Sequence, residues 1–164
     1  MNPWGRRTTE EANLLNPAFG CIVLSAATHG YQSIEGRGMA YPLAYTILPL
    51  ILHRITRDAL PSTARTPMAI WLQEHSDAKV QFFERVLALK PHTRESILFG
   101  ANQKWLGLVR STLVFSGAEN AIDRALRRLD DEAKECVGKA RIVGKWFATV
   151  GTTETSMHLW GIRP

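Results

Sequence analysis

The stretch GRGMAYPLAYTILPLILHR, residues 36–54, contains no charged side chain between Met39 and Leu52. A membrane-spanning helix needs about 20 predominantly apolar residues, whereas an apolar run of about 10–14 residues is more often a buried helix of a folded core. This run is shorter than a membrane span, and basic residues follow it directly. We therefore expect a helix that begins at Pro42 and lies buried at the centre of a cytoplasmic protein that does not enter a membrane.

The length and composition of the chain indicate one folded domain. The 164 residues predict a single domain over residues 1–164, long enough to bury a substantial core. Cys21 and Cys136 lie far apart in apolar helical patterns, which favours reduced, buried thiols in a cytosolic protein over a disulfide. The net charge of +5 permits contact with nucleic acid or with an acidic protein surface, but the chain has no block of Lys and Arg.

Helix and strand signals predict a mainly α fold. Asn16 followed by Pro17 predicts the start of a helix, and Gly30 predicts its end. Further helices are predicted from residue 68, over residues 77–89, over residues 93–104 after a break at Pro91, over residues 118–148 with a break near Asp130, and from Thr153. Residues 108–115 are rich in β-branched side chains and predict a strand or a short hairpin.

The order of these elements suggests a winged-helix-like element within a compact helical domain. Two helices followed by a β-hairpin, here residues 77–89, 93–104 and 108–115, are typical of a winged helix. In a DNA-binding protein the second helix would enter the major groove with its exposed side chains. These would be Arg94, Asn102, Gln103 and Lys104. Because basic residues are sparse there, we favour an ordinary amphipathic helix.

No catalytic arrangement is recognisable in the sequence. The chain lacks the Gly-x-x-x-x-Gly-Lys phosphate loop and the Gly-x-Ser-x-Gly nucleophile elbow. Cys-x-x-Cys and His-x-x-x-His pairs are absent as well, which leaves little support for a zinc site. His53 and Asp58 could form a base and its orienting carboxylate, but a helix end followed by a loop charge explains them better. We therefore expect no enzyme activity and no residues that hold a cofactor or a metal.

Residues 54–67 are the most informative candidate for binding. Arg54, Arg57 and Arg65 occur there together with the hydroxyls of Ser62 and Thr63. Guanidinium and hydroxyl groups suit phosphates or a partner rich in carboxylates. A solvated connecting loop has the same composition, and both interpretations stay open at this stage.

A second candidate surface is residues 139–151, which carry the basic side chains Arg141 and Lys145 beside Trp146. Gly144 is placed within a predicted helix, where it costs about 1 kcal/mol relative to Ala unless another chain segment must approach closely. Either a helix of the same chain packs against Gly144, which we favour, or a partner chain does.

Several motifs in the chain resemble the middle component of bacterial three-component ABC-ATPase defence systems, which are Lamassu-like. The motifs are NLLNPAFG, GYQ, GMAYPLAYTILPLILHRITRDALPSTARTPMAIWLQEH, PHTRESILFG, ARIVGKWFA and WGIRP. The resemblance extends over residues 13–164 and departs mainly in residues 111–132. Such systems encode an SMC-like ABC ATPase, an effector that is often a nuclease, and a small middle protein.

The resemblance implies a non-enzymatic adaptor that bridges the ATPase and the effector in an anti-phage or anti-plasmid complex. DNA would then be reached through the complex. The residues implied at the interface, together with those of the second candidate surface, are Arg54, Arg57, Ser62, Thr63, Arg65, Trp71, Gln73, Arg141, Lys145 and Trp146. The alternative that the residues leave open is a stand-alone winged-helix DNA-binding regulator.

Overall fold

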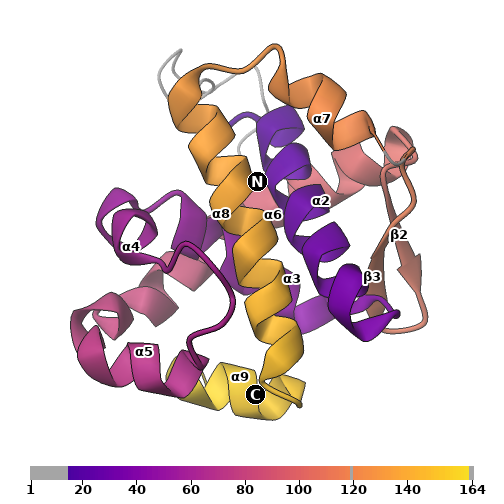
Figure 1. Ribbon diagram of the computed structural model, residues 1–164. Helices are drawn as coiled ribbons and strands as arrows, with labels where there is room; N and C mark the ends of the chain where they lie inside the picture. Colours follow the sequence, from indigo (N-terminus) through magenta and orange to yellow (C-terminus); the bar gives the residue numbers. More distant parts are fainter. Residues whose placement is uncertain (1–14, 119, 163–164) are drawn as a thin grey trace.

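The computed structural model describes residues 15–118 and 120–162, and these fold as a group of packed helices with a small antiparallel sheet on one side (Figure 1). In chain order the elements are helix α2 (Pro17–Glu35), strand β1 (Met39–Ala40), α3 (Tyr41–Ile51), α4 (Arg54–Ala59), α5 (Met68–Glu74), the 3-10 helix η2 (Ser76–Lys79), α6 (Phe82–Asn102), β2 (Leu106–Val109), β3 (Thr112–Phe115), α7 (Ala121–Leu126), α8 (Asp131–Thr149) and α9 (Thr153–Leu159). The prediction of a mainly α fold with a short β element is confirmed.

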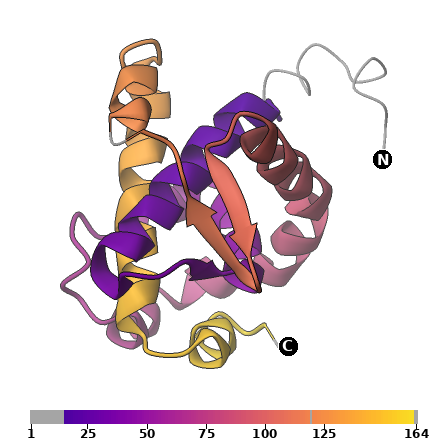
Figure 2. The same ribbon diagram turned by 90° about the vertical axis from the view of Figure 1, so that its right-hand side faces the viewer.

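Helix α2 lies between α8 on one side and α6 on the other (Figure 2). As predicted, it begins at Asn16 and Pro17, where the Asn16 side chain accepts a hydrogen bond from the backbone N–H of Ala18 at 2.9 Å. The predicted end at Gly30 is wrong, because the helix continues to Glu35. It terminates at Gly36, which adopts the left-handed backbone conformation with φ of 68°.

Gly30 belongs instead to a close crossing of α2 and α8. A Cβ atom at Gly30 would collide with the backbone carbonyl oxygen of Arg141, and a Cβ atom at Gly144 would collide with the carbonyl oxygen of Ala27. Each helix therefore uses a glycine to admit the backbone of the other. The packing partner of Gly144 is thus a helix of the same chain, as the sequence favoured.

Helix α3 is the apolar stretch from which the sequence analysis started. Leu43, Ile47, Leu50 and Ile51 are each at most 1% exposed, so the prediction of a buried central helix is confirmed. Within residues 15–118 and 120–162, every helix is too short or too polar to cross a membrane.

Helix α6 differs from the prediction, because residues 77–89 and 93–104 do not form two helices separated at Pro91. Pro91 lies inside one continuous helix, on its exposed side. The residue four positions earlier, Leu87, is also exposed, so water can bond the carbonyl oxygen that loses its N–H partner. Thr93 is buried and donates its hydroxyl to the carbonyl oxygen of Leu89 at 3.0 Å, so it is not a helix cap. The helix pair expected of a winged helix is therefore a single helix before the hairpin.

The predicted hairpin is present and acquires a third strand. Strands β2 and β3 pair antiparallel, with Val109 opposite Thr112. The two-residue strand β1 pairs with the other edge of β3 and places Met39 opposite Leu113, both fully buried. The sequence analysis missed β1, because two residues before an apolar helix carry no strand signal of their own.

The predicted break in the long C-terminal helical stretch is also present, between α7 and α8. The Asp130 side chain accepts a hydrogen bond from the N–H of Ala133 at 2.8 Å and so caps the first turn of α8.

The glycine crossing gives a direct test of the packing. Gly144→Ala should destabilise the protein by about 1–3 kcal/mol, because the added methyl group forces α2 and α8 apart. Gly138→Ala on the same helix is the matched control, since a Cβ atom there meets nothing within 4 Å. It should stabilise the protein by up to about 1 kcal/mol through helix propensity. Urea unfolding of both variants measures the difference, and equal stabilities would contradict the crossing.

Candidate partner-binding site

The first part of the arginine segment is a short helix rather than an exposed connector. Helix α4 is capped by His53, whose Nδ1 lies 3.3 Å from the N–H of Thr56 and 2.7 Å from its hydroxyl. Arg57 on this helix is only 4% exposed. Its Nη1 donates to the carbonyl oxygen of Ile51 at 3.0 Å, and its Nη2 donates to Glu132 Oε1 at 2.8 Å.

Arg57 therefore ties the end of α3 to the first turn of α8. The prediction that Arg57 lies exposed is wrong, because its side chain is buried and its guanidinium group donates to two internal acceptors. The guanidinium satisfies a carbonyl at a helix end, one of the backbone groups that a helix leaves unbonded.

The following loop, residues 60–67, is held near both ends by side chains from α5 and α8. Trp71 Nε1 donates to the carbonyl oxygen of Ala59 at 3.2 Å, and Lys139 Nζ donates to that of Leu60 at 2.6 Å. At the other end, Trp146 Nε1 donates to the carbonyl oxygen of Thr66 at 2.6 Å. These three donors bond backbone atoms, so they fix the path of the loop without using its side chains.

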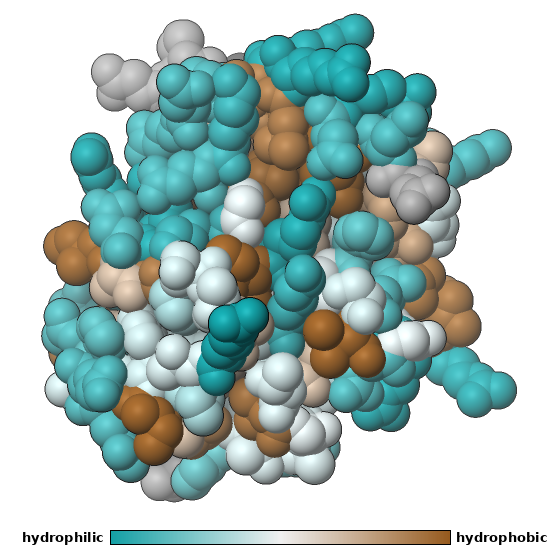
Figure 3. Space-filling view, in the orientation of Figure 1, coloured by the Kyte–Doolittle hydropathy of each residue, from teal (hydrophilic) through white to brown (hydrophobic). Residues whose placement is uncertain are grey.

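The side chains that this loop presents outward are Ser62, Thr63 and Arg65, all of them exposed. Arg54 on α4 is also exposed and forms an ion pair with Asp58 at 3.6 Å. We call Arg54, Ser62, Thr63 and Arg65 the loop surface. The face of the molecule that carries it is mostly hydrophilic or of intermediate hydropathy (Figure 3).

The ten candidate residues differ in how far the structure exposes them. Arg54, Ser62, Thr63, Arg65 and Gln73 are exposed, Arg141 and Lys145 are half-buried, and Arg57, Trp71 and Trp146 are buried. The two tryptophans meet edge to face, with ring centroids 5.3 Å apart, and Trp71 stacks on His75 at 4.4 Å. Both tryptophans are buried, and their indole N–H groups bond the backbone at the two ends of the loop.

The candidates on α8 do not all belong to the loop. Arg141 Nη2 bonds Asp123 of α7 at 3.3 Å, so this guanidinium is directed toward α7. Sequence reasoning missed Lys139, although it precedes Trp146 by seven residues and therefore lies on the same side of α8. That spacing, together with the proline-bounded loop, is the signal that could have identified it.

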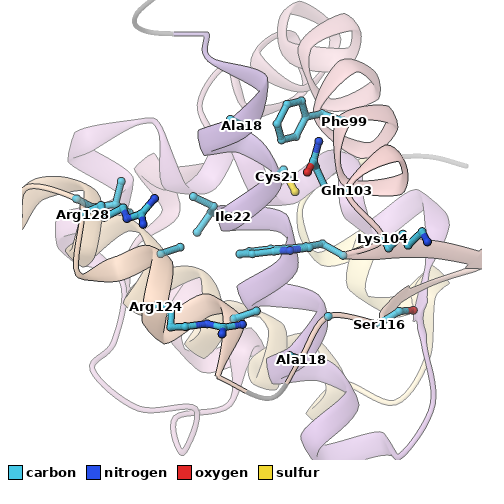
Figure 4. A pocket seen from close by; sticks show the side chains of 15 residues that line it. Ala18, Cys21, Ile22, Phe99, Gln103, Lys104, Ser116, Ala118, Arg124 and Arg128 are labelled. Carbon is cyan, nitrogen blue, oxygen red and sulfur yellow. The ribbon is translucent and has the colours of Figure 1, made fainter.

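A groove of about 740 Å³ opens elsewhere, between α2, the end of α6 and α7 (Figure 4). Arg124 and Arg128 lie on one side and Lys104 on the other, with small or apolar side chains of α2 between them, among them Cys21 and Ile22. None of the described residues that line the groove is acidic. The groove therefore suits an anionic group bordered by apolar surface.

The described residues offer little for catalysis. Burial raises the pKa of the Cys21 thiol in the groove to about 11, so this thiol is protonated and unreactive at neutral pH. His53 bonds Thr56 through Nδ1, and Asp58 pairs with Arg54, so the hypothetical pairing of His53 with Asp58 is not formed. Burial, and then the charge of Arg85, lower the pKa of His53. Across residues 15–118 and 120–162 no cluster of His, Cys, Asp or Glu is arranged to hold a metal ion.

The burial of Arg57 predicts a clear contrast between two neighbouring arginines. Arg57→Ala should lower the free energy of unfolding by more than about 1 kcal/mol, because it leaves the Ile51 carbonyl without its donor. Arg54→Ala should change it by less than about 0.5 kcal/mol, since Arg54 is exposed. Thermal or urea unfolding compares the two, and equal effects would contradict the assigned roles.

The support given by Trp146 can be tested on the loop itself. Trp146→Phe keeps an aromatic ring but removes the donor to Thr66, so the loop should open more often. Trypsin should then cut faster after the exposed Arg65. Trp105→Phe, at the start of the hairpin, is the control and should leave this cut unchanged. Equal cleavage rates after Arg65 in the wild type and Trp146→Phe would show that the bond does not hold the loop.

The amino-acid sequence matches the model of one known protein family. The model of the family described as ABC-three component (ABC-3C) system Middle Component 3 matches residues 4–164, which include the whole loop surface and its supports. No curated protein and no solved structure is significantly similar to the chain. The resemblance to a middle component of a three-component ABC system is thereby confirmed. The chain belongs to the ABC-three component system Middle Component 3 family.

Proposed function

We propose that this chain is a non-enzymatic, cytoplasmic adaptor that bridges an SMC-like ABC ATPase and an effector of the nuclease class in an anti-phage or anti-plasmid defence complex. Membership in a middle-component family supports a role alongside the other components of an ABC three-component system. DNA would be engaged through the complex.

The observation that carries this proposal is the contrast between the held backbone and the free surface of the 60–67 loop. Lys139 and Trp146 bond two of its carbonyl groups, and Trp71 bonds that of Ala59 just before it. The side chains of Ser62, Thr63 and Arg65 are exposed. A loop fixed before binding loses less conformational entropy when a partner docks. We infer that the loop surface is the contact with one partner.

The chemistry of the loop surface indicates what that partner presents. Arg54 and Arg65 supply guanidinium groups, and Ser62 and Thr63 supply hydroxyls. Guanidinium groups bind carboxylates through paired hydrogen bonds, and arginine is enriched among residues that dominate binding energy. A partner surface with exposed carboxylates fits best.

Two further observations support an adaptor over the alternatives. Among the described residues, the Cys21 thiol lies 3.9 Å from the Ser25 hydroxyl and His53 bonds Thr56, and neither pair is the nucleophile-and-base arrangement of covalent catalysis. The DNA-binding regulator depended on a separate recognition helix over residues 93–104, and this segment is continuous with the preceding helix in α6. The separate helix on which that alternative was based is therefore not formed.

The test is a double variant of the exposed arginines, Arg54→Ala with Arg65→Ala, in a binding assay with the other two components of the system. It should weaken binding by about tenfold or more, with the melting temperature unchanged. The matched control is Arg37→Ala with Arg127→Ala, because Arg37, like Arg54, is exposed and pairs with a local carboxylate.

Undiminished binding by the loop variant, or equal weakening in the control, would contradict the proposal. Intact complexes with a specific loss of salt-sensitive DNA binding would instead favour a DNA-binding role for the loop.

A further inference from the structure

Helix α6 carries a second set of apolar side chains on the side that faces away from the core. Phe83, Leu87 and Leu98 are 46%, 52% and 59% exposed. Pro91 and Ala101 are exposed as well. These five residues follow one another at intervals of three, four or seven positions, so they form one line along the helix. Arg94 is the charged residue on this line. We call these six residues the α6 seam: Phe83, Leu87, Pro91, Arg94, Leu98 and Ala101.

The opposite side of α6 already supplies its contribution to the core. Phe82, Ile97 and Gly100 are buried there, and the helix packs against α2 and α3. An amphipathic helix at a protein surface normally presents polar side chains to water on its outer side. A helix that is apolar on both sides is ordinarily covered on both, and a line of large exposed apolar residues marks an interaction site.

The position of α6 separates it from the 60–67 loop. Helix α6 lies on the far side of α2 from α8, and the 60–67 loop lies beyond α8 (Figure 2). Lys139 and Trp146 of α8 hold that loop. One partner on the 60–67 loop would therefore leave the outer side of α6 free for another.

The spacing and the single charge indicate what covers the seam. Intervals of three and four residues are the pattern by which one helix packs along another. The 21 residues of α6 extend over about 30 Å, long enough for several turns of contact. Arg94, at the middle of the line, needs an anionic partner when water is excluded from it.

We propose that the α6 seam binds an amphipathic helix of one of the other two components, with apolar residues along its contact side and a carboxylate opposite Arg94. This inference rests on the proposed adaptor function and assigns the second of the two surfaces that bridging requires.

A second copy of this chain is a poorer occupant of the seam. Arg94 lies near the midpoint of the line, so a two-fold pairing of α6 with itself that covers the whole seam places two Arg94 side chains close together. Lys90 is exposed on the same part of the helix and adds to the repulsion. The net charge of +5 per chain opposes self-association further.

The test introduces charge into the seam and into an equally exposed apolar pair elsewhere. The seam variant is Leu87→Glu with Leu98→Glu. The control is Leu108→Glu with Val109→Glu on the hairpin, where the side chains are 56% and 55% exposed. Affinity for each of the other two components is measured separately, beside melting curves and the solution mass of each variant.

The seam variant should lose about 100-fold in affinity for one component, while the control changes little and both melt like the wild type. Arg94→Glu should weaken the same contact about tenfold, and a carboxylate-to-lysine change on the partner helix should restore it. Unchanged affinity of the seam variant would overturn the inference, as would a wild-type dimer that the seam variant dissociates.

The binding results of the two variants and of the wild type test the seam inference separately from the adaptor proposal. Loss of binding in the Arg54→Ala, Arg65→Ala variant with full binding in the seam variant overturns the seam inference alone. A wild-type chain that binds neither component overturns the adaptor proposal itself.

Discussion

The close contact between α2 and α8 determines where the rest of the molecule can lie. Gly30 and Gly144 allow each helix to approach the backbone of the other, which fixes the rotation of α8 about its axis. At about 100° per residue, Lys139 and Trp146 are then directed roughly away from Gly144. The same contact that closes the core therefore aims two donors at the carbonyl groups of the 60–67 loop.

Residues of the same type that are neighbours in the sequence have different roles in this arrangement. Arg57 is internal and joins α3 to α8, whereas Arg54 and Arg65 are exposed. The apolar side chains of α6 divide in the same way between the core side and the α6 seam. The proposed adaptor role requires two separate surfaces, and the 60–67 loop and helix α6 lie on opposite sides of α2 (Figure 2).

Local signals in the sequence predicted the elements whose boundaries are set locally. The start of α2 at Asn16, the buried helix α3 and the hairpin followed from caps, apolar runs and β-branched residues. The errors at Gly30 and Pro91 have a tertiary cause. A glycine required by a crossing helix resembles a terminator, and a proline on the outer side of a helix resembles a break.

The sequence indicated the segment that forms the candidate site, but not which of its side chains are buried and which are exposed. The burial of Arg57 depends on Glu132, which is 75 positions away, and no pattern within residues 54–67 reveals it. The helices predicted over residues 77–89 and 93–104 did not reveal the exposed apolar line of α6, because periodicity shows that a helix has apolar sides but not how many are covered. Hydrogen–deuterium exchange on the assembled three-component complex tests the central claim most directly. The account predicts protection of the 60–67 loop by one component and of the outer side of α6 by the other. Protection of only one of these regions when both components are bound would contradict it.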